Sequence, residues 1–189
     1  MKHHIFWDFN GTIIDDIMNA CESVNDMLAR KGKAPITLEQ YYTYVETPII
    51  GFYRHILTPE ELDFDDISRQ YHEDYARRSN ETFLADYAKE LIEKLYSEGA
   101  KQYIITSNYI EEVNDLLKKH GIADYFEAVL GADDKLAESK AERAKKFYDS
   151  ADIDANDAIF IGDTLHDLET ANALGIDCVL VSYGHQGRR

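Results

Sequence analysis

The sequence has few cysteines, few basic residues and no long hydrophobic run, and each scarcity excludes a class of protein. Its two cysteines, Cys21 and Cys178, lie far apart without metal-site spacing, so we expect core residues rather than a disulfide framework or a zinc site. No segment has the composition of a signal peptide or a membrane span, which favours a cytoplasmic protein. There is no internal repeat and no low-complexity segment.

The shortage of basic residues limits the partners that the chain can bind. Acidic residues outnumber basic ones by 36 to 20, and the formal net charge at pH 7 is -16. Nucleic-acid binding depends on Lys and Arg that neutralise phosphates, so we expect no nucleic-acid partner. The same charge argues against an anionic membrane surface. A small phosphorylated ligand remains compatible with it if a local metal ion or lysine reverses the field.

The chain begins with an apolar strand at about 5–8 and a turn at Asn10-Gly11, and its second half alternates helices and strands. Further strands are predicted at 102–106, 126–130, 158–161 and 178–181, and helices at 87–98, 110–120, 138–149 and 165–174. This alternation implies an α/β doubly wound fold, with a parallel sheet covered by helices on both faces. Residues 184–189 are expected to form a loop or a frayed tail.

Residues 16–84 interrupt this alternation. Helical spacing runs through 16–31 and 63–78, and the only three prolines of the chain, Pro35, Pro48 and Pro59, lie between these two segments. We therefore predict a helical insert without a strand of its own. The predicted domains are an α/β core of residues 1–15 and 85–189 and a helical cap of residues 16–84.

Reactive side chains follow the predicted strands or begin a helix. Asp8 follows the first strand, Thr106-Ser107-Asn108 follows the second, Lys140 begins a helix, and Gly162-Asp163-Thr164-Leu165-His166-Asp167 follows the fourth. In an open α/β sheet, ligands bind outside the carboxyl ends of the strands. These groups are therefore expected to meet at one edge of the sheet.

This pattern resembles the haloacid dehalogenase (HAD) superfamily. The resemblance rests on Asp-x-x-Gly-Thr-x-x-Asp at 8–15, a hydroxyl residue near 107, a lysine near 140 and Gly-Asp-x-x-x-Asp at 162–167, and it covers nearly the whole chain. The insert is similar to the first cap type of that superfamily, as in phosphoglycolate phosphatases and β-phosphoglucomutases. The resemblance implies a phosphatase that uses Mg²⁺ and forms an aspartyl-phosphate.

The resemblance also assigns roles. Asp8 would be the nucleophile, and Mg²⁺ would be held by Asp8, Asp163 and the backbone carbonyl of Asn10, with Asp167 orienting a water on the metal. Ser107 and Lys140 would bind the phosphoryl oxygens. The residues predicted to contact substrate are Gly11, Thr12, Thr106, Asn108 and Arg54.

Several of these assignments have competitors. Thr106 competes with Ser107, which directly precedes Asn108 as in the family's Ser/Thr-Asn pattern. Lys135 competes with Lys140, which begins an amphipathic helix and lies at the family's distance before Gly162-Asp163. Three further residues have ordinary alternatives: a helix-capping Asp167, an exposed His166 and a solvated Arg54.

The sequence departs from the family at Asn10, where the usual motif has the aspartate that serves as general acid and base. An amide cannot exchange a proton near neutral pH, although it can hydrogen-bond a leaving-group oxygen. General acid–base help contributes typically about 10²–10⁴-fold to a rate. The expected consequences are slow turnover, a leaving group that needs no proton, a persistent aspartyl-phosphate or a phosphate-binding relic.

Four functions follow in order of preference. The first is a Mg²⁺-dependent phosphatase or phosphotransferase, similar to phosphoglycolate phosphatase, whose partner is a small phosphorylated metabolite and which is a monomer or small homo-oligomer. A dehalogenase fits less well, because Lys140, Asp163 and Asp167 together suit phosphate and Mg²⁺. A phospho-accepting signalling domain would lack the long insert. A catalytically silent phosphate-binding protein is suggested by Asn10 alone.

Overall fold

A parallel sheet of five strands forms the centre of the protein, for which a computed structural model describes residues 2–132 and 139–186. Its order is β5-β4-β1-β6-β7, so β1 lies in the middle, paired with β4 on one side and β6 on the other. The residue after β1 therefore stands at the centre of the sheet's carboxyl edge. The strands are β1 (His4–Trp7), β4 (Lys101–Tyr109), β5 (Ala128–Ala132), β6 (Ala158–Gly162) and β7 (Asp177–Leu180).

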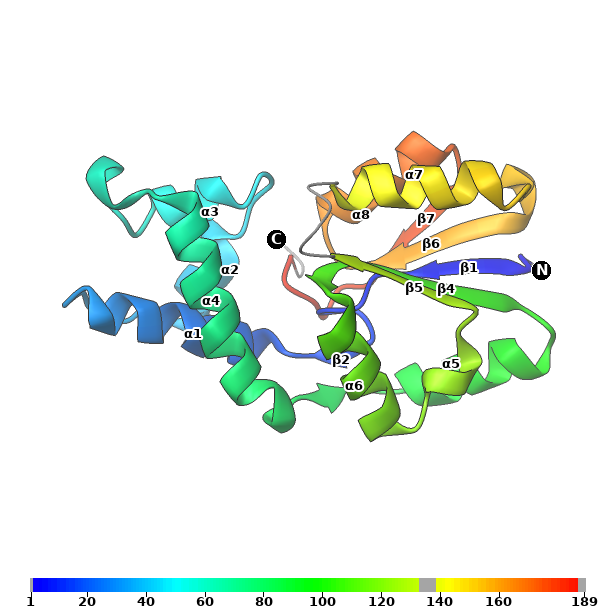
Figure 1. Cartoon of the computed structure of the whole chain (residues 1–189), viewed down its shortest axis with the longest axis horizontal. Coiled ribbons are helices and arrows are strands. Elements are labelled where there is room, and N and C mark those ends of the chain that lie inside the picture. The colour runs from blue at the N-terminus through cyan, green and yellow to red at the C-terminus, as the bar shows by residue number, and fades with distance from the viewer. Residues whose placement is uncertain (1, 133–138, 187–189) are drawn as a thin grey trace.

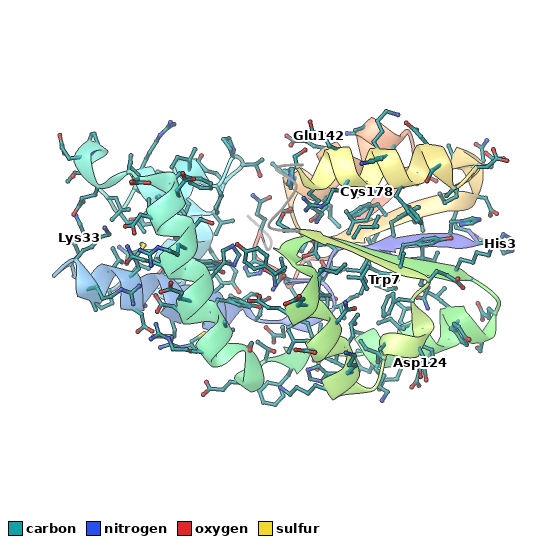
Figure 2. All side chains as sticks on the ribbon, viewed as in Figure 1. His3, Trp7, Lys33, Asp124, Glu142 and Cys178 are labelled. Carbon is teal, nitrogen blue, oxygen red and sulfur yellow. The ribbon has the colours of Figure 1, made fainter. Side chains whose placement is uncertain are left out.

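Helices cover both faces of this sheet, which confirms the predicted α/β doubly wound fold (Figure 1). Successive side chains of a strand point to opposite faces. On β1, Trp7 packs against α5 and α6, whereas Phe6 packs on the other side, where Cys178 also lies (Figure 2). The covering helices are α5 (Ala88–Ser97), α6 (Ile110–His120), α7 (Lys140–Ser150) and α8 (Leu165–Leu174).

The four helices of the first half form a separate group beside the carboxyl edge of the sheet (Figure 1). They share a hydrophobic cluster that includes Val24, Met27, Phe52 and Ile67. This separate cluster supports the division into a core of residues 1–15 and 85–189 and a cap of residues 16–84, which stays a proposal. The helices are α1 (Ile17–Arg30), α2 (Leu38–Tyr44), α3 (Ile50–Arg54) and α4 (Phe64–Arg78). Short 3₁₀ turns are η1 (Pro59–Glu61), η2 (Ser79–Glu81), η3 (Ala123–Tyr125) and η4 (Ala155–Asp157).

The prediction that residues 16–84 contain no strand was wrong. Phe83–Leu84 forms β3, which pairs antiparallel with β2 (Ile14–Asp15). The chain enters the helical group after residue 15 and leaves it near residue 84, so the two connections run side by side in opposite directions. Their backbone groups satisfy one another there, and apolar periodicity cannot reveal so short a pair.

Residues 184–186, the described part of the predicted loop or frayed tail, form turns and bends outside any helix or strand, as expected of a loop. Residues 181–186 run between the sheet and the helical group, and His185 is largely buried there (Figure 1). The rest of that predicted tail, 187–189, lies outside the described residues. None of the described helices has the length and apolar character needed to cross a bilayer.

Candidate active site

Asp8 stands directly after β1 and is buried. Its backbone N–H donates to the carbonyl of Ile161 on β6 at 2.8 Å, which fixes it at the sheet edge. The chain then turns sharply at Gly11, whose φ is 72°. A Cβ at Gly11 would lie 2.4 Å from a carboxylate oxygen of Asp163, so only glycine allows this approach.

Three buried carboxylates, from Asp8, Asp163 and Asp167, meet at this edge with ligand oxygens within 4.8 Å of one another. The pKa of Asp8 is raised to about 8, because burial, opposed by the Lys140 ammonium, is reinforced by the carboxylates of Asp167 and Asp163. Burial likewise raises the pKa of Asp163 to about 6. A cation would relieve this repulsion, and oxygen-only ligands suit Mg²⁺, so the residues fit the implied metal.

Lys140 lies at the floor of the same site and is buried. It is the first residue of α7, whose N-cap Ser139 forms a capping box with Glu142. The Nζ of Lys140 donates to Asp8 Oδ1 and, at 2.6 Å, to Asp167 Oδ1. Burial alone would lower the pKa of Lys140, but these two carboxylates raise it above its usual value, so the amine is charged. The competing Lys135 lies outside the described residues.

Asp167 both caps a helix and faces the site. Its Oδ2 accepts hydrogen bonds from the Thr164 backbone N–H at 2.9 Å and the Thr164 hydroxyl at 2.7 Å, at the start of α8. Its Oδ1 accepts from Lys140. One carboxylate oxygen of Asp167 therefore caps α8, as the alternative interpretation expected, and the other faces the active site.

Thr106, Ser107 and Asn108 all line the cleft above Asp8. The predicted strand end at 106 was too early, because β4 continues to Tyr109 through an irregularity after Ile105. The Thr106 hydroxyl is buried and accepts from the Asn108 N–H at 3.1 Å, whereas Ser107 is exposed. The open hydroxyl favours Ser107 as the phosphate-binding residue.

The side-chain amide nitrogen of Asn10 donates two hydrogen bonds. Its Nδ2 donates to Asp16 Oδ2 at 2.7 Å and to the Tyr75 hydroxyl at 2.6 Å. Tyr75 in turn donates to the same oxygen of Asp16 at 2.8 Å. Both amide hydrogens of Asn10 are thus occupied, which leaves none for a leaving-group oxygen.

The sequence did not indicate Asp16 or its partner His185. Asp16 Oδ1 accepts from the Gly11 N–H at 2.8 Å and lies 3.2 Å from His185 Nε2. Burial alone would raise the pKa of Asp16, but His185 and the other hydrogen bonds hold it below its usual value. Burial alone would lower the pKa of His185, but Asp16 outweighs it and the pKa is about 9. The acidic pair Asp15-Asp16 before a helix was the available signal for Asp16, whereas nothing in the sequence marks His185.

The remaining predicted residues differ in how close they lie to the site. Thr12 is buried beneath the carboxylates, where its hydroxyl donates to Asp163 Oδ1 at 3.4 Å. His166 lines the cleft and is partly exposed. Arg54 is exposed on α3 and is not among the residues that line the cleft.

The chain is similar in sequence to a family of hydrolases and to phosphatases within it. A model of the haloacid dehalogenase-like hydrolase family matches residues 5–181. A phosphoglycolate phosphatase of Pseudomonas fluorescens is 27% identical over 98% of this chain and 71% of its own length. One from Psychrobacter arcticus is 26% identical over 97% of this chain and 85% of its own length.

A solved haloacid dehalogenase-like hydrolase from Streptococcus pneumoniae has the same fold. Its TM-score is 0.85 at 21% identity, over 99% of this chain and 88% of that one. Because the family model spans nearly all of the chain, including every strand of the sheet, the chain belongs to the haloacid dehalogenase-like hydrolase family.

Proposed function

We propose that this hydrolase is a Mg²⁺-dependent phosphatase that acts on a small phosphorylated metabolite through an aspartyl-phosphate on Asp8. The observation that carries the proposal is the buried arrangement of Asp8, Asp163 and Asp167 around the charged Lys140 at the end of β1. The names of the phosphoglycolate phosphatase relatives support the phosphatase assignment.

The chain's own residues provide most of the chemistry. A carboxylate oxygen of Asp8 attacks phosphorus, the bond from phosphorus to the leaving oxygen breaks, and water later hydrolyses the acyl phosphate. Lys140 and the Ser107 hydroxyl would bind phosphoryl oxygens as charge develops on them. Asp8, Asp163 and the Asn10 backbone carbonyl would hold Mg²⁺, with Asp167 beside them. The ion would neutralise charge on the phosphoryl group.

Because position 10 carries an asparagine, the proposed phosphatase should turn over slowly. No side chain at position 10 can protonate the leaving oxygen, and both amide hydrogens are already donated to Asp16 and Tyr75. The departing alkoxide must then take its proton from water. The same observation favours the second candidate, a protein that accepts or binds a phosphoryl group without efficient hydrolysis.

A paired measurement tests the proposal. The protein is incubated with Mg²⁺ and an aryl phosphate, and phosphate release is measured together with the intact mass of the chain. Steady release identifies a phosphatase, and a chain carrying one phosphoryl group without release identifies the second candidate. Asp8→Asn should abolish both signals. Asp15→Asn is the control and should retain them, because Asp15 is exposed. Neither signal in the parent protein would contradict both the phosphatase and a phospho-accepting protein, and would leave only binding without covalent chemistry.

The other expectations stay predictions. These are a cytoplasmic location, a monomer or small homo-oligomer, and the absence of nucleic-acid and membrane partners. They follow from composition and charge alone.

A further inference from the structure

The cleft above Asp8 has a volume of about 680 Å³ and extends from the carboxylate cluster to the helical group. What it can bind beyond the phosphoryl group is decided by the side chains on its far wall. The following inference rests on the proposed phosphatase function and names the substrate class for that same site.

The far wall is mostly apolar and aromatic. Tyr41, Phe52 and Tyr53 line it as buried side chains of the cap. Ile49 and Phe64 also line it, and each remains 46% exposed. Large hydrophobic side chains open to solvent mark a cleft that can bind an apolar ligand. Covering them removes apolar surface from water, which makes binding more favourable.

Among the described residues, no lysine or arginine stands on the far wall to receive an anionic group. The cation beside it, His185, already contacts Asp16 through Nε2 and the Tyr41 hydroxyl through Nδ1, at 3.2 and 2.8 Å. Among the described residues that line the cleft, Lys140 is the only lysine or arginine, and it is bonded to Asp8 and Asp167. On the cap side the acidic groups Asp16 and Glu46 line the cleft. A carboxylate on the substrate would lose its hydration there and meet like charges.

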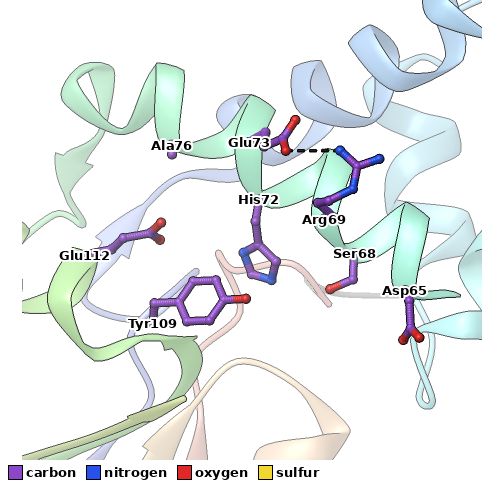
Figure 3. A pocket seen from close by; sticks show the side chains of 8 residues that line it. All are labelled: Asp65, Ser68, Arg69, His72, Glu73, Ala76, Tyr109 and Glu112. Atoms are coloured by element: carbon purple, nitrogen blue, oxygen red, sulfur yellow. Dashed lines mark hydrogen bonds and ion pairs between the residues drawn. The ribbon is translucent and has the colours of Figure 1, made fainter. Parts of the chain in front are cut away.

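His72 lies on α4, and with Ser68 it lines both the cleft and a neighbouring hollow of about 520 Å³ (Figure 3). Its ring lies beside that of Tyr109, with 4.9 Å between centroids. Burial lowers the pKa of His72, so the ring is neutral near pH 7. Its Nδ1 is buried and makes no hydrogen bond within the described chain. His72 therefore adds a neutral ring, not a cation, to this side of the cleft.

The neighbouring hollow has one cation among its described lining residues, and acidic residues already bind it. Its arginine, Arg69, donates to Glu73 at 3.1 Å and also to Asp66. The acidic Asp65 and Glu112 also line this hollow, from α4 and α6 respectively (Figure 3). A ligand that extends from the cleft past His72 would therefore again meet acidic surroundings.

We propose that the substrate is a phosphate monoester of an uncharged alcohol with an apolar or aromatic body of about ring size, and not an ester that carries a carboxylate. The ring packs on Ile49 and Phe64. The product of hydrolysis is then a neutral alcohol, which distinguishes this chain from the phosphoglycolate phosphatases that it resembles.

Binding of two stable phosphonates tests this without requiring turnover. We choose 2-phenylethylphosphonate, which mimics benzyl phosphate, and 3-phosphonopropionate, which mimics phosphoglycolate, each titrated by calorimetry with Mg²⁺. The phenyl compound should bind at least about tenfold more tightly, the low end of what an apolar pocket discriminates. Values of kcat/KM for benzyl phosphate and phosphoglycolate should follow the same order.

A positive charge placed on the far wall should weaken the preference for the phenyl compound. Ile49→Lys should narrow the difference in binding by about tenfold, because it adds a cation and removes an apolar contact. Leu91→Lys is the matched control, since Leu91 is 42% exposed on α5 and does not line the cleft, and it should leave the ratio unchanged. Equal or tighter binding of 3-phosphonopropionate to the parent protein overturns the substrate class while preserving the phosphatase. Binding of neither phosphonate overturns the phosphatase proposal together with this inference.

A cationic ligand gives a third comparison. 2-Aminoethylphosphonate should bind more weakly than the phenyl compound, since it has no apolar body to cover Ile49 and Phe64. Tighter binding of the amine would show that the acidic residues of the cleft select charge, and it would overturn the proposal of a neutral substrate.

Discussion

The side-chain amide of Asn10 donates a 2.7 Å hydrogen bond to the buried carboxylate of Asp16. Position 10 thus carries an amide instead of the aspartate expected there as general acid, while the Asp16 carboxylate stands one hydrogen bond away. That carboxylate accepts four hydrogen bonds or ion-pair contacts and its pKa is held below the usual value, so it is ionised.

Asn10→Asp should raise the rate of alkyl phosphate hydrolysis by about 10²–10⁴-fold, the usual range for a positioned acid and base. The new carboxyl would face Asp16, and two carboxyls that share a site cannot both ionise easily. One of them should hold a proton near neutral pH, as a general acid requires. The gain should be smaller with aryl phosphates, whose leaving groups need little protonation.

The control is Asn10→Ala, which removes the amide without adding an acid and should not gain activity. Asn-Gly sequences deamidate, so intact-mass analysis must show that the parent protein still carries Asn10. If Asn10→Asp binds Mg²⁺ yet hydrolyses alkyl phosphates no faster than the parent, the missing acid does not limit turnover. A silent or phospho-accepting protein would then explain the site better.

Much of this geometry followed from the sequence because strand ends are local features. The apolar run before Asp8, the turn at Asn10-Gly11 and the later alternation were sufficient to place Asp8, Lys140 and Asp163 at one edge of a parallel sheet. The placement of Asp16 and His185 was not accessible. Their pairing joins residues 169 positions apart, and no periodicity encodes a contact between a helix start and a tail.

Loss of metal binding should follow removal of either strand-end carboxylate. Asp8→Asn and Asp163→Asn each take a negative oxygen ligand from the cluster and should weaken Mg²⁺ binding by at least about tenfold, measured by calorimetry. Asp15→Asn serves as the matched control, because Asp15 is acidic, close in sequence and exposed. Unchanged affinity in both site variants would mean that the ion binds elsewhere.

Lys140→Met should destabilise the metal-free protein. The substitution removes the ammonium that contacts Asp8 and Asp167 and leaves two buried carboxylates facing each other. Breaking a buried pair in this way costs about 3–5 kcal/mol, and protonation of Asp8 would reduce the loss. Denaturant unfolding in a chelating buffer measures the effect.

Lys145→Met on the same helix is the comparison for that experiment. Lys145 pairs with Asp149 at 3.0 Å, with both side chains more than half exposed, and such pairs contribute about 0–1 kcal/mol. Added Mg²⁺ should restore part of the stability lost in Lys140→Met, because it supplies the missing positive charge. Equal stability of the two variants would show that Lys140 does not hold the carboxylates together.

The pair of His185 and Asp16 should make stability depend on pH in the metal-free protein. The pKa of His185 is about 9 in the folded chain and about 6.5 when unfolded, so the folded state binds the proton more tightly. A raised histidine pKa contributes its full stabilisation below pH 6.5, and the contribution is lost as the pH rises through 9. His185→Gln removes this contribution.

Unfolding free energies of the parent and His185→Gln, measured in urea between pH 6 and pH 10, provide the test. The parent should exceed the variant by about 2–3 kcal/mol near pH 6, and the difference should shrink towards pH 10. Asp8 and Asp163, whose pKa values are also raised, add a slope of the same sign to both proteins. The difference between the two proteins therefore reports on His185 and on its effect on the neighbouring Asp163. His166→Gln is the control, because His166 is partly exposed and lies 3.6 Å from Glu169, and its difference from the parent should be small. A difference between the parent and His185→Gln that stays constant across this range would show that His185 packs in the cleft as a neutral ring and that its contact with Asp16 carries no charge.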